Sequence, residues 1–536
     1  EMTLRRLWTW LQAPLDRMRL LATLAAACRP LRGGALASAV HGCSRAGDAL
    51  AHEACTSVLQ RVLAPLLAMM RAWMTEGELR DPFQEFFVCA DSSVPLEELW
   101  TRMYALDVEM VPSFVSLDLA RRILLTGKSV NFIRLCCPGQ DWLPAGEMDI
   151  EGKATAEDEA TAAGWRSDVP LADLSARVEE AALRTNKHLV SLMMGTYALG
   201  EHCLALRKFL LLGQGDFAES LLDAAGPELS KNASEVYKHT LQGIVEMAAR
   251  QTNAQFCGPD VLARLGVRLL KPSAGEKAWD IFLLDYAIDS PLHVVFTPVA
   301  MQQYERAFAF LWKLRRVSHA LSSCWSQQMA LRRHLVACGH MIGTRAPELR
   351  LEMRQTLHKC TCLRNEMHHF VQNIHSYIMC EVLETSWAKL QAGWQACVDL
   401  DQVILEHQRY LSCIEEGAFL ARRTEPIFTA LGALLGLALE FTELHDQVCA
   451  STFETIDILS SEPDGPRPFA RSLVECRAQI DQLGASFLAR LLTLLRALEA
   501  QPALRHLSSD LRFLLCRLDF NAYYEQKRPP PPLSER

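Results

Sequence analysis

The chain has 536 residues, of which 50% are hydrophobic and 22% charged, and its formal net charge at pH 7 is -8. This length exceeds what one hydrophobic core supports, so we expect two or three packing units. The composition excludes a disordered or collagen-like chain. No nucleic-acid partner is expected, because phosphate contacts need clustered Lys and Arg, and basic runs such as Arg315-Arg316 are short.

The cysteines and the N-terminal region favour a cytosolic protein. The 18 cysteines are scattered as single positions and form no dense disulfide framework. Near the N-terminus, Asp16, Arg17 and Arg19 interrupt the apolar stretch, so no signal-peptide core is expected. The most apolar run, 427–439, is shorter than the roughly 20 residues that a membrane-spanning helix needs. Because the first residue is Glu1, we expect the sequence to be truncated at its start.

Helical periodicity dominates and predicts an all-α fold: an elongated succession of helical bundles in two domains, with at most one small β-hairpin. An N-terminal helical-bundle domain is expected over residues 1–137 and a C-terminal helical domain over residues 176–524. Residues 138–175 are acidic and poor in large apolar side chains, which predicts a flexible linker or insertion. The proline-rich end, 525–536, is expected to be disordered or polyproline-like.

Three stretches of the C-terminal domain carry the clearest helical pattern, with apolar residues recurring at steps of three and four. Each such stripe needs a partner helix. The stripes are Tyr304, Phe308, Leu311 and Trp312; Met367, Phe370, Ile374, Tyr377 and Ile378; and Cys476, Ile480, Leu483, Phe487, Leu491, Leu494 and Leu498. The best strand signals, 281–284 and 293–296, flank the turn-like Asp289-Ser290-Pro291 and predict a hairpin.

Gly127-Lys128-Ser129 resembles the end of a phosphate-binding loop. That loop also needs a glycine five residues before Gly127, so that its N–H groups can face phosphate, and Arg122 stands there instead. The preceding residues continue a helical pattern. We therefore expect no nucleotide site and a structural role for Lys128 and Ser129.

Gly213, Gln214 and Gly215 resemble the start of a dinucleotide-binding loop, but the third glycine position holds Ala218. The residues before this segment are helical in pattern. The two glycines are better explained as the end of one helix, with Asp216 capping the next.

One cluster has the chemistry of metal ligands, on a stretch that is also apolar and lacks paired C-x-x-C spacing. It consists of His358, Cys360, Cys362, Glu366, His368 and His369. No G-x-S-x-G nucleophile elbow is present, and no Ser, Cys or His stands out from ordinary helix content. We expect no catalytic residues, no bound cofactor and no metal site.

Three segments resemble, in order, motifs of the gamma-tubulin complex component (spindle pole body component) family. Residues 122–134, RILLTGKSVNFIR, are similar to that family's ILLTGKSINFL motif. Residues 210–217, LLLGQGDF, resemble the start of its C-terminal domain, and residues 517–524, RLDFNAYY, resemble its closing motif. The resemblance covers nearly the whole chain, 4–524. The segments most similar to component-three members are 33–41, 76–79, 85–88 and 252–256.

This resemblance implies a structural subunit of a hetero-oligomer, in which GTP belongs to gamma-tubulin. The N-terminal domain would pack against neighbouring components, especially component two, and the C-terminal domain would bind one gamma-tubulin to template microtubule nucleation. The location implied is the cytoplasm and cytoskeleton, at microtubule organising centres and spindle poles. Component-three members carry a long N-terminal extension and a further bundle before the position matching Leu4, and on this resemblance we expect both to be missing from this sequence, through truncation or real loss.

Polar residues inside the shared motifs are the best candidates for gamma-tubulin contact, although each could instead cap a helix or form a buried hydrogen bond. These candidates are Gln214, Asp216, Asn253, Gln255, Arg517, Asp519 and Asn521. The alternative function is a helical-rod vesicle-tethering or adaptor protein, because long helical bundles also build tethers. Binding of gamma-tubulin discriminates between the two.

Overall fold

The computed structural model describes residues 3–45, 49–137, 171–273, 275–339, 342, 347–461, 469–500 and 508–527. These form two compact units. Unit 1 contains the chain up to Leu199 together with Ile288–Thr297 and Ala396–Ile404, and unit 2 contains Gly200–Ala287, Pro298–Gln395 and the chain from Leu405 onward.

Unit 1 is built around helix α4 (Leu117–Cys136), which packs against α3 (Ala49–Glu76) and α6 (Leu171–Ser191). The helix begins at Leu117 because the Ser116 hydroxyl accepts a hydrogen bond from the backbone N–H of Leu119 at 3.2 Å. The remaining elements are α1 (Leu4–Cys28), α2 (Gly33–Ser44), β1 (Val88–Ala90), η1 (Leu96–Glu98), η2 (Leu99–Met103), β2 (Tyr104–Leu106), η3 (Leu192–Thr196) and η6 (Leu292–Val294).

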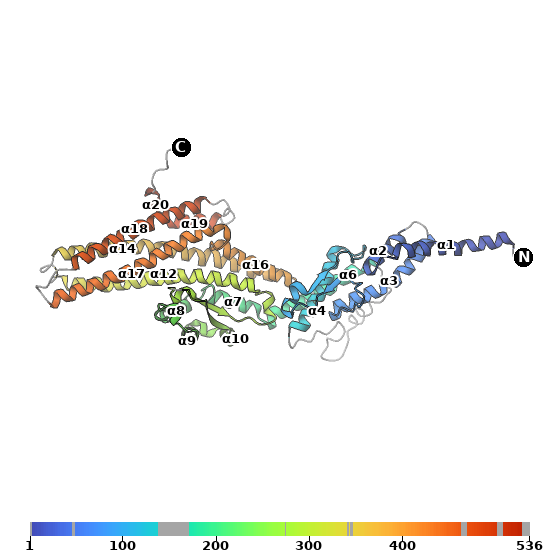
Figure 1. Cartoon of the computed structure of the whole chain (residues 1–536), viewed down its shortest axis with the longest axis horizontal. Helices are drawn as coiled ribbons and strands as arrows, with labels where there is room; N and C mark the ends of the chain where they lie inside the picture. Colours follow the sequence, from blue (N-terminus) through green and yellow to red (C-terminus); the bar gives the residue numbers. More distant parts are fainter. Residues whose placement is uncertain are drawn as a thin grey trace, which may run out of the picture. The chain divides into compact units, whose positions relative to one another are not determined.

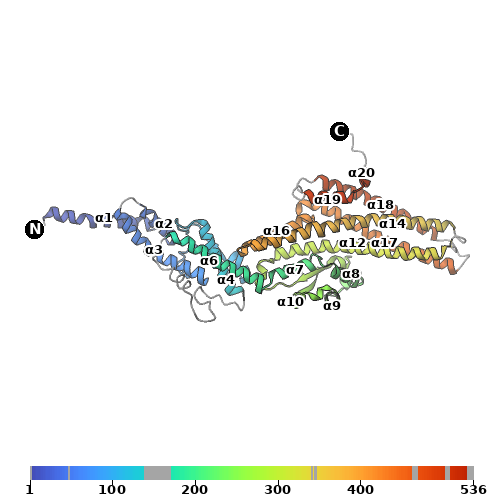
Figure 2. The same ribbon diagram turned by 180° about the vertical axis from the view of Figure 1, so that it is seen from behind.

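Unit 2 is a bundle of four long helices, α12 (Pro298–Ala337), α14 (Pro347–Ser376), α17 (Glu425–Ser461) and α18 (Phe469–Ala500), which run side by side (Figures 1 and 2). Each packs mainly against two neighbours, in the order α12, α14, α18, α17 and back to α12, and α14 and α17 make a smaller contact across the bundle. The later part of the chain adds η7 (Tyr377–Glu384), α15 (Thr385–Ala396), α16 (Leu400–Gly417), η8 (Arg422–Thr424), α19 (Ser508–Leu518) and α20 (Tyr523–Gln526).

A smaller layer of unit 2 lies along this bundle. It consists of α7 (Leu199–Phe209), α8 (Gly215–Leu229), η4 (Ala233–Glu235), α9 (Lys238–Gln251), η5 (Asn253–Phe256), α10 (Pro259–Ala263), β3 (Leu265–Leu269), α11 (Ala278–Ile281) and β4 (Phe282–Tyr286). In both views, α8, α9 and α10 lie on one side of the long helices, and α19 and α20 lie on the opposite side (Figures 1 and 2).

The apolar stripes seen in the sequence form the bundle interior. Tyr304 and Phe308 on α12 are fully buried, and Phe370 on α14 meets Phe487 on α18 edge to face with ring centroids 5.9 Å apart. Removing one such ring from water stabilises the fold by about 1.5–3 kcal/mol. Packing of facing stripes therefore fixes which helices are neighbours.

The all-α fold class is confirmed, with two corrections to the predicted strands. The described residues contain two small antiparallel sheets rather than at most one: β1 pairs with β2, and β3 pairs with β4. The expected partner of β4, 293–296, is wrong, because 292–294 forms the 3₁₀ turn η6. Leu265–Leu269 pairs with β4 instead, placing buried Val267 opposite Leu284.

The boundary between the units lies at Leu199, whereas the sequence predicted a C-terminal domain starting at 176. The reason is that α6 packs along α4 and so belongs to unit 1. Most of the predicted linker, 138–170, lies outside the described residues, and its last part, 171–175, is the first turn of α6. In the predicted tail, 525–527 complete α20 and its cap, and 528–536 lie outside the described residues.

One stretch among the described residues, Leu400–Ile458, is long and apolar enough to cross a membrane by length and composition. Of its apolar window, 44% is buried inside the structure. Helix α17, which fills much of this stretch, packs against α12 and α18. A core helix has this composition, and we interpret α17 as one.

Candidate partner-binding surfaces

Gly127, Lys128 and Ser129 lie inside helix α4 and not in a loop. The Lys128 amine is buried and donates to the backbone oxygen of Trp100 at 3.2 Å, and the Ser129 hydroxyl donates to the side-chain oxygen of Asn186 at 3.0 Å. Desolvation lowers the pKa of Lys128, while Asp401 acts against that shift. The segment therefore holds unit 1 together and presents no row of free N–H groups to a phosphate.

Four of the predicted contact residues come together in unit 2, at a surface that we call the 214–256 corner. Gln214 is the N-cap of α8, and the Asp216 carboxylate accepts hydrogen bonds from the backbone N–H groups of Phe217 and Asn253, both at 2.9 Å. Burial acts to raise the pKa of Asp216, but these hydrogen bonds and those from the Gln214 and Asn253 side chains hold it below its ordinary value. Asp216 thus ties α8 to η5.

The same corner also presents exposed side chains to solvent. Asn253 and Gln255 are exposed, and the neighbouring Phe256 ring is 79% exposed. An exposed aromatic ring bordered by amides has the composition of a protein-protein contact.

The other three predicted residues form a second surface, the 517–524 corner. Arg517 pairs with Glu381 of η7 at 2.8 Å, and Asp519 accepts hydrogen bonds from the backbone N–H groups of Tyr524 at 2.9 Å and Glu525 at 3.0 Å. Asp519 therefore caps α20. Asn521 is exposed.

Two aromatic rings accompany this second corner. Phe520 is 89% exposed and Phe513, on α19, is 61% exposed. The corner is on the opposite side of the long helices from α8 (Figures 1 and 2). The seven predicted residues therefore make two separate surfaces rather than one site, and both carry exposed phenylalanines that the motif comparison did not single out.

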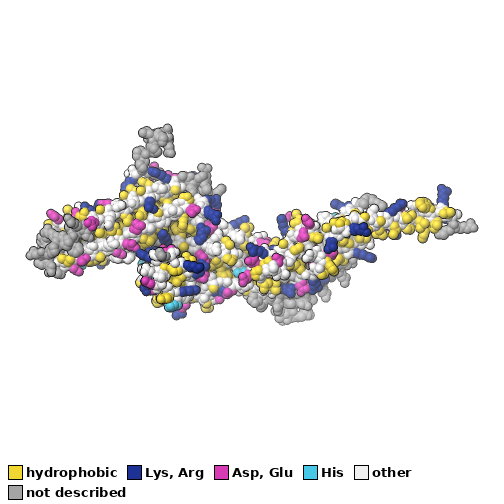
Figure 3. All heavy atoms as spheres, viewed as in Figure 1, with side chains coloured by type: hydrophobic (Ala, Val, Ile, Leu, Met, Phe, Trp, Pro, Cys, Tyr) yellow, Lys and Arg dark blue, Asp and Glu magenta, His cyan; other side chains and the backbone are white. Residues whose placement is uncertain are grey.

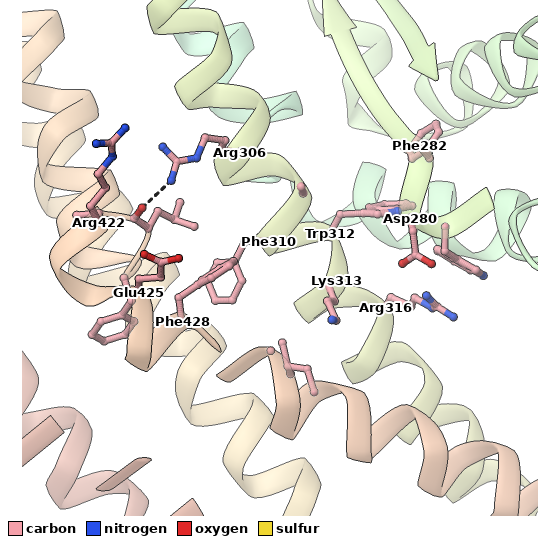
Figure 4. Close-up of a pocket in the computed structure, with 17 residues that line it drawn as sticks. Asp280, Phe282, Arg306, Phe310, Trp312, Lys313, Arg316, Arg422, Glu425 and Phe428 are labelled. Carbon is pink, nitrogen blue, oxygen red and sulfur yellow. Dashed lines mark hydrogen bonds between the residues drawn. The ribbon is translucent and has the colours of Figure 1, made fainter. Parts of the chain in front are cut away.

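A cavity of about 860 Å³ opens between α12, the η8 turn with the start of α17, and the α11–β4 segment (Figure 4). Its aromatic walls include Trp312, Phe310 and Phe428, the last two meeting edge to face at 5.5 Å between centroids. The sequence did not point to this cavity, because its walls come from three segments that are far apart in the chain. No periodic or spaced motif marks such a set.

Basic side chains ring the cavity. Arg306 is held by Glu415 at 3.1 Å and donates to the backbone oxygen of Leu420 at 2.7 Å. Arg316 stacks on the Trp279 ring at 4.6 Å, and burial lowers its pKa against the opposing effect of Asp280 and Glu443. Aromatic walls with a cationic rim suit an aromatic or acidic side chain of a partner protein.

The cluster with metal-ligand chemistry on α14 does not converge in the structure. His358 and Cys362 approach each other, with the sulfur 3.7 Å from Nε2, as residues four apart on one helix do. Cys360 is fully buried, whereas Cys362 is exposed, so these two side chains do not share a face.

The fold and these surfaces define a protein of packed helical bundles that exposes aromatic and polar docking faces. Two family models match in succession: Gamma tubulin complex component N-terminal over residues 1–195 and Gamma tubulin complex component C-terminal over residues 199–524. The chain belongs to the gamma-tubulin complex component family. The junction between the two matches coincides with the boundary between the two units.

Several curated relatives support this membership. The chain is 37% identical over 544 residues to gamma-tubulin complex component 3 of Arabidopsis thaliana, covering 98% of this chain and 63% of the relative. It is 35% identical over 548 residues to the Homo sapiens component 3, covering 99% and 58%. It is 32% identical over 498 residues to the Schizosaccharomyces pombe spindle pole body component alp6, covering 90% and 56%. The chain thus spans about three fifths of the length of these relatives.

Members of this family are structural subunits of a complex and not enzymes, which agrees with the expectation that the chain carries no catalytic site. The greater similarity to component 3 also agrees with the sequence motifs. A component 2 from Mus musculus is only 23% identical over 598 residues.

Proposed function

We propose that this chain is a structural subunit of the gamma-tubulin complex that binds gamma-tubulin through unit 2 and neighbouring components, component two among them, through unit 1. The observation that carries the proposal is the succession of two family domains over 1–195 and 199–524, whose junction lies at the first boundary between the two compact units; unit 1 also includes Ile288–Thr297 and Ala396–Ile404 from the second match. Such a subunit acts in the cytoskeleton, at microtubule organising centres and spindle poles, to template microtubule nucleation.

The bundle of unit 2 suits this role physically. Its four long helices are joined by continuous apolar packing, and a close-packed interior resists deformation. A subunit that holds a tubulin at a fixed position needs this rigidity more than it needs a reactive group. GTP binding then belongs to gamma-tubulin.

The two corners are the proposed gamma-tubulin contacts. At each corner the acidic residue, Asp216 or Asp519, accepts hydrogen bonds from the backbone of the same unit. The nearby phenylalanine, Phe256 or Phe520, is exposed to solvent. Interface energy concentrates in a few aromatic and Arg side chains. We therefore propose that Phe256 and Phe520 supply most of the binding free energy for gamma-tubulin, and that the neighbouring polar groups set the orientation in which it binds.

In unit 1, helix α1 is the proposed contact for a neighbouring component. It has no buried residue, and Trp8 and Trp10 are 63% and 66% exposed. Hydrophobic side chains are visible on the surface along this helix (Figure 3). Aromatic residues are enriched at interfaces. The double substitution Trp8→Ala with Trp10→Ala should weaken binding of component two and leave gamma-tubulin binding unchanged.

The corner assignment is tested by measuring gamma-tubulin affinity for the full chain and for two variants, Phe256→Ala and Phe520→Ala. Val336→Ala on α12 is the matched control, because Val336 is 77% exposed and lies at neither corner. A ring that contacts the partner should cost at least about tenfold in affinity. If the wild-type chain binds gamma-tubulin and neither Phe256→Ala nor Phe520→Ala lowers the affinity, the two corners are not the gamma-tubulin contacts. If the wild-type chain does not bind gamma-tubulin, the proposed function is wrong.

A further inference from the structure

Three potential metal ligands meet inside unit 2, where α12 faces α17. They are Cys324, His445 and Asp446, whose ligand atoms all lie within 4.8 Å of one another. Cys324 and His445 are buried, and the Asp446 side chain is 60% exposed. The sequence analysis did not find this group, because Cys324 lies on a different helix from the other two.

A further thiol, Cys449, lies next to His445 but outside the group of three whose ligand atoms are all within 4.8 Å of one another. The Cys449 sulfur is 3.5 Å from Nε2 of His445, one helical turn further along α17. Residues four apart lie on the same helical face, so His445 and Cys449 point from one face of α17, and Cys324 approaches from the facing helix α12. The set combines two thiols, an imidazole and a carboxylate.

Charge balance in this part of the bundle supports a bound cation. Arg364 on α14 is buried, is electrostatically coupled to Cys324, and its Nε finds no hydrogen-bond partner among the described residues. A buried guanidinium is costly without a nearby anion. Two thiolates and one carboxylate around a divalent ion carry a net charge of about -1, which Arg364 neutralises.

We propose that Cys324, His445, Asp446 and Cys449 bind one zinc-class divalent ion that joins α12 to α17. Thiolate and imidazole ligands select zinc over magnesium or calcium, which prefer an all-oxygen set. Zinc lies about 2.0–2.3 Å from nitrogen, oxygen and sulfur ligands, so the donors would have to close slightly around it.

The test is titration of the metal-free full chain with cobalt(II), followed by displacement with zinc(II). We expect one cobalt per chain, visible tetrahedral bands and a near-ultraviolet thiolate-to-cobalt band, all lost when zinc is added. Cys324→Ala and Cys449→Ser should each raise the dissociation constant more than about tenfold, since even outer-shell partners of ligands are worth about 10–100-fold. Cys203→Ala, at a fully buried cysteine of unit 2 outside this group, should bind as the wild type does.

Asp446→Ala separates ligand loss from misfolding, because this side chain is largely exposed and its removal leaves the core intact. It should weaken cobalt binding while leaving the helical circular dichroism unchanged. Absence of a thiolate band in the wild-type chain, or an unchanged spectrum in Cys324→Ala, would overturn the proposal.

Discussion

The shared motif on α4 contains a glycine whose role is packing, and the substitution Gly127→Ala tests that role. A Cβ at this position would lie 2.0 Å from Cε2 and 2.2 Å from Nε1 of Trp73. Trp73 is fully buried, and its Nε1 donates to the backbone oxygen of Ile123 at 2.9 Å. The added methyl group must therefore displace an indole ring that has nowhere to move.

The cost can be assembled from its parts. Overpacking costs about 1–3 kcal/mol, loss of the buried indole hydrogen bond about 1–3 kcal/mol, and the higher helix propensity of Ala returns about 1 kcal/mol. The net destabilisation of unit 1 is about 1–5 kcal/mol, with a midpoint near 3 kcal/mol. At about 1.4 kcal/mol per factor of ten, the midpoint corresponds to a roughly 150-fold change.

Hydrogen exchange of the α4 amides, read by mass spectrometry, measures this change locally. Protection of peptides within Leu117–Cys136 should fall by about two orders of magnitude at the midpoint cost. The control is Gly42→Ala in α2, an exposed site with no heavy atom within 4 Å of the new Cβ, where no loss is expected. If Gly127→Ala leaves α4 equally or better protected, the packing account of this motif is refuted.

Two further predictions concern unit 2. Asp519→Ala removes the cap of α20 and should lower local stability by about 0.5–2 kcal/mol, seen as faster amide exchange at Tyr524 and Glu525. Burial lowers the pKa of His407 to about 4, below its ordinary value near 6.5, so the unfolded chain binds this proton more readily. Stability is therefore complete above about pH 6.5 and falls by on the order of 3 kcal/mol as the pH drops to about 4. His407→Gln should flatten this part of the stability profile in urea titrations, and an unchanged slope would contradict the assignment.

Local features of the fold could be predicted from the sequence because they depend on neighbouring residues. The helical stripe through Phe308 and Trp312 follows from spacing alone, and both rings are buried. The prediction that Asp216 caps α8 is wrong, because Gln214 is the N-cap; Asp216 lies in the first turn of α8 and its carboxylate ties this helix to η5 instead. The sequence pattern predicts the wrong partner for strand β4, because the residues near Phe282 do not specify which segment lies beside them. Its true partner, Leu265–Leu269, contains a glycine, which weakens the strand signal.

Features assembled from distant segments could not be predicted. The cavity beside α12 and the meeting of Cys324 with His445 depend on which helices are neighbours. The motifs that carry the family resemblance are, in contrast, contiguous segments and can therefore be recognised in the sequence. They do not reveal that their polar residues divide between two opposite sides of the bundle.

The most direct test of the central claim is a crosslinking map of the full chain with purified gamma-tubulin, read by mass spectrometry. We expect a one-to-one complex whose crosslinks fall in unit 2, at residues around 214–256 or 517–524. A complex crosslinked only through residues 1–199, or no complex at all, would contradict it.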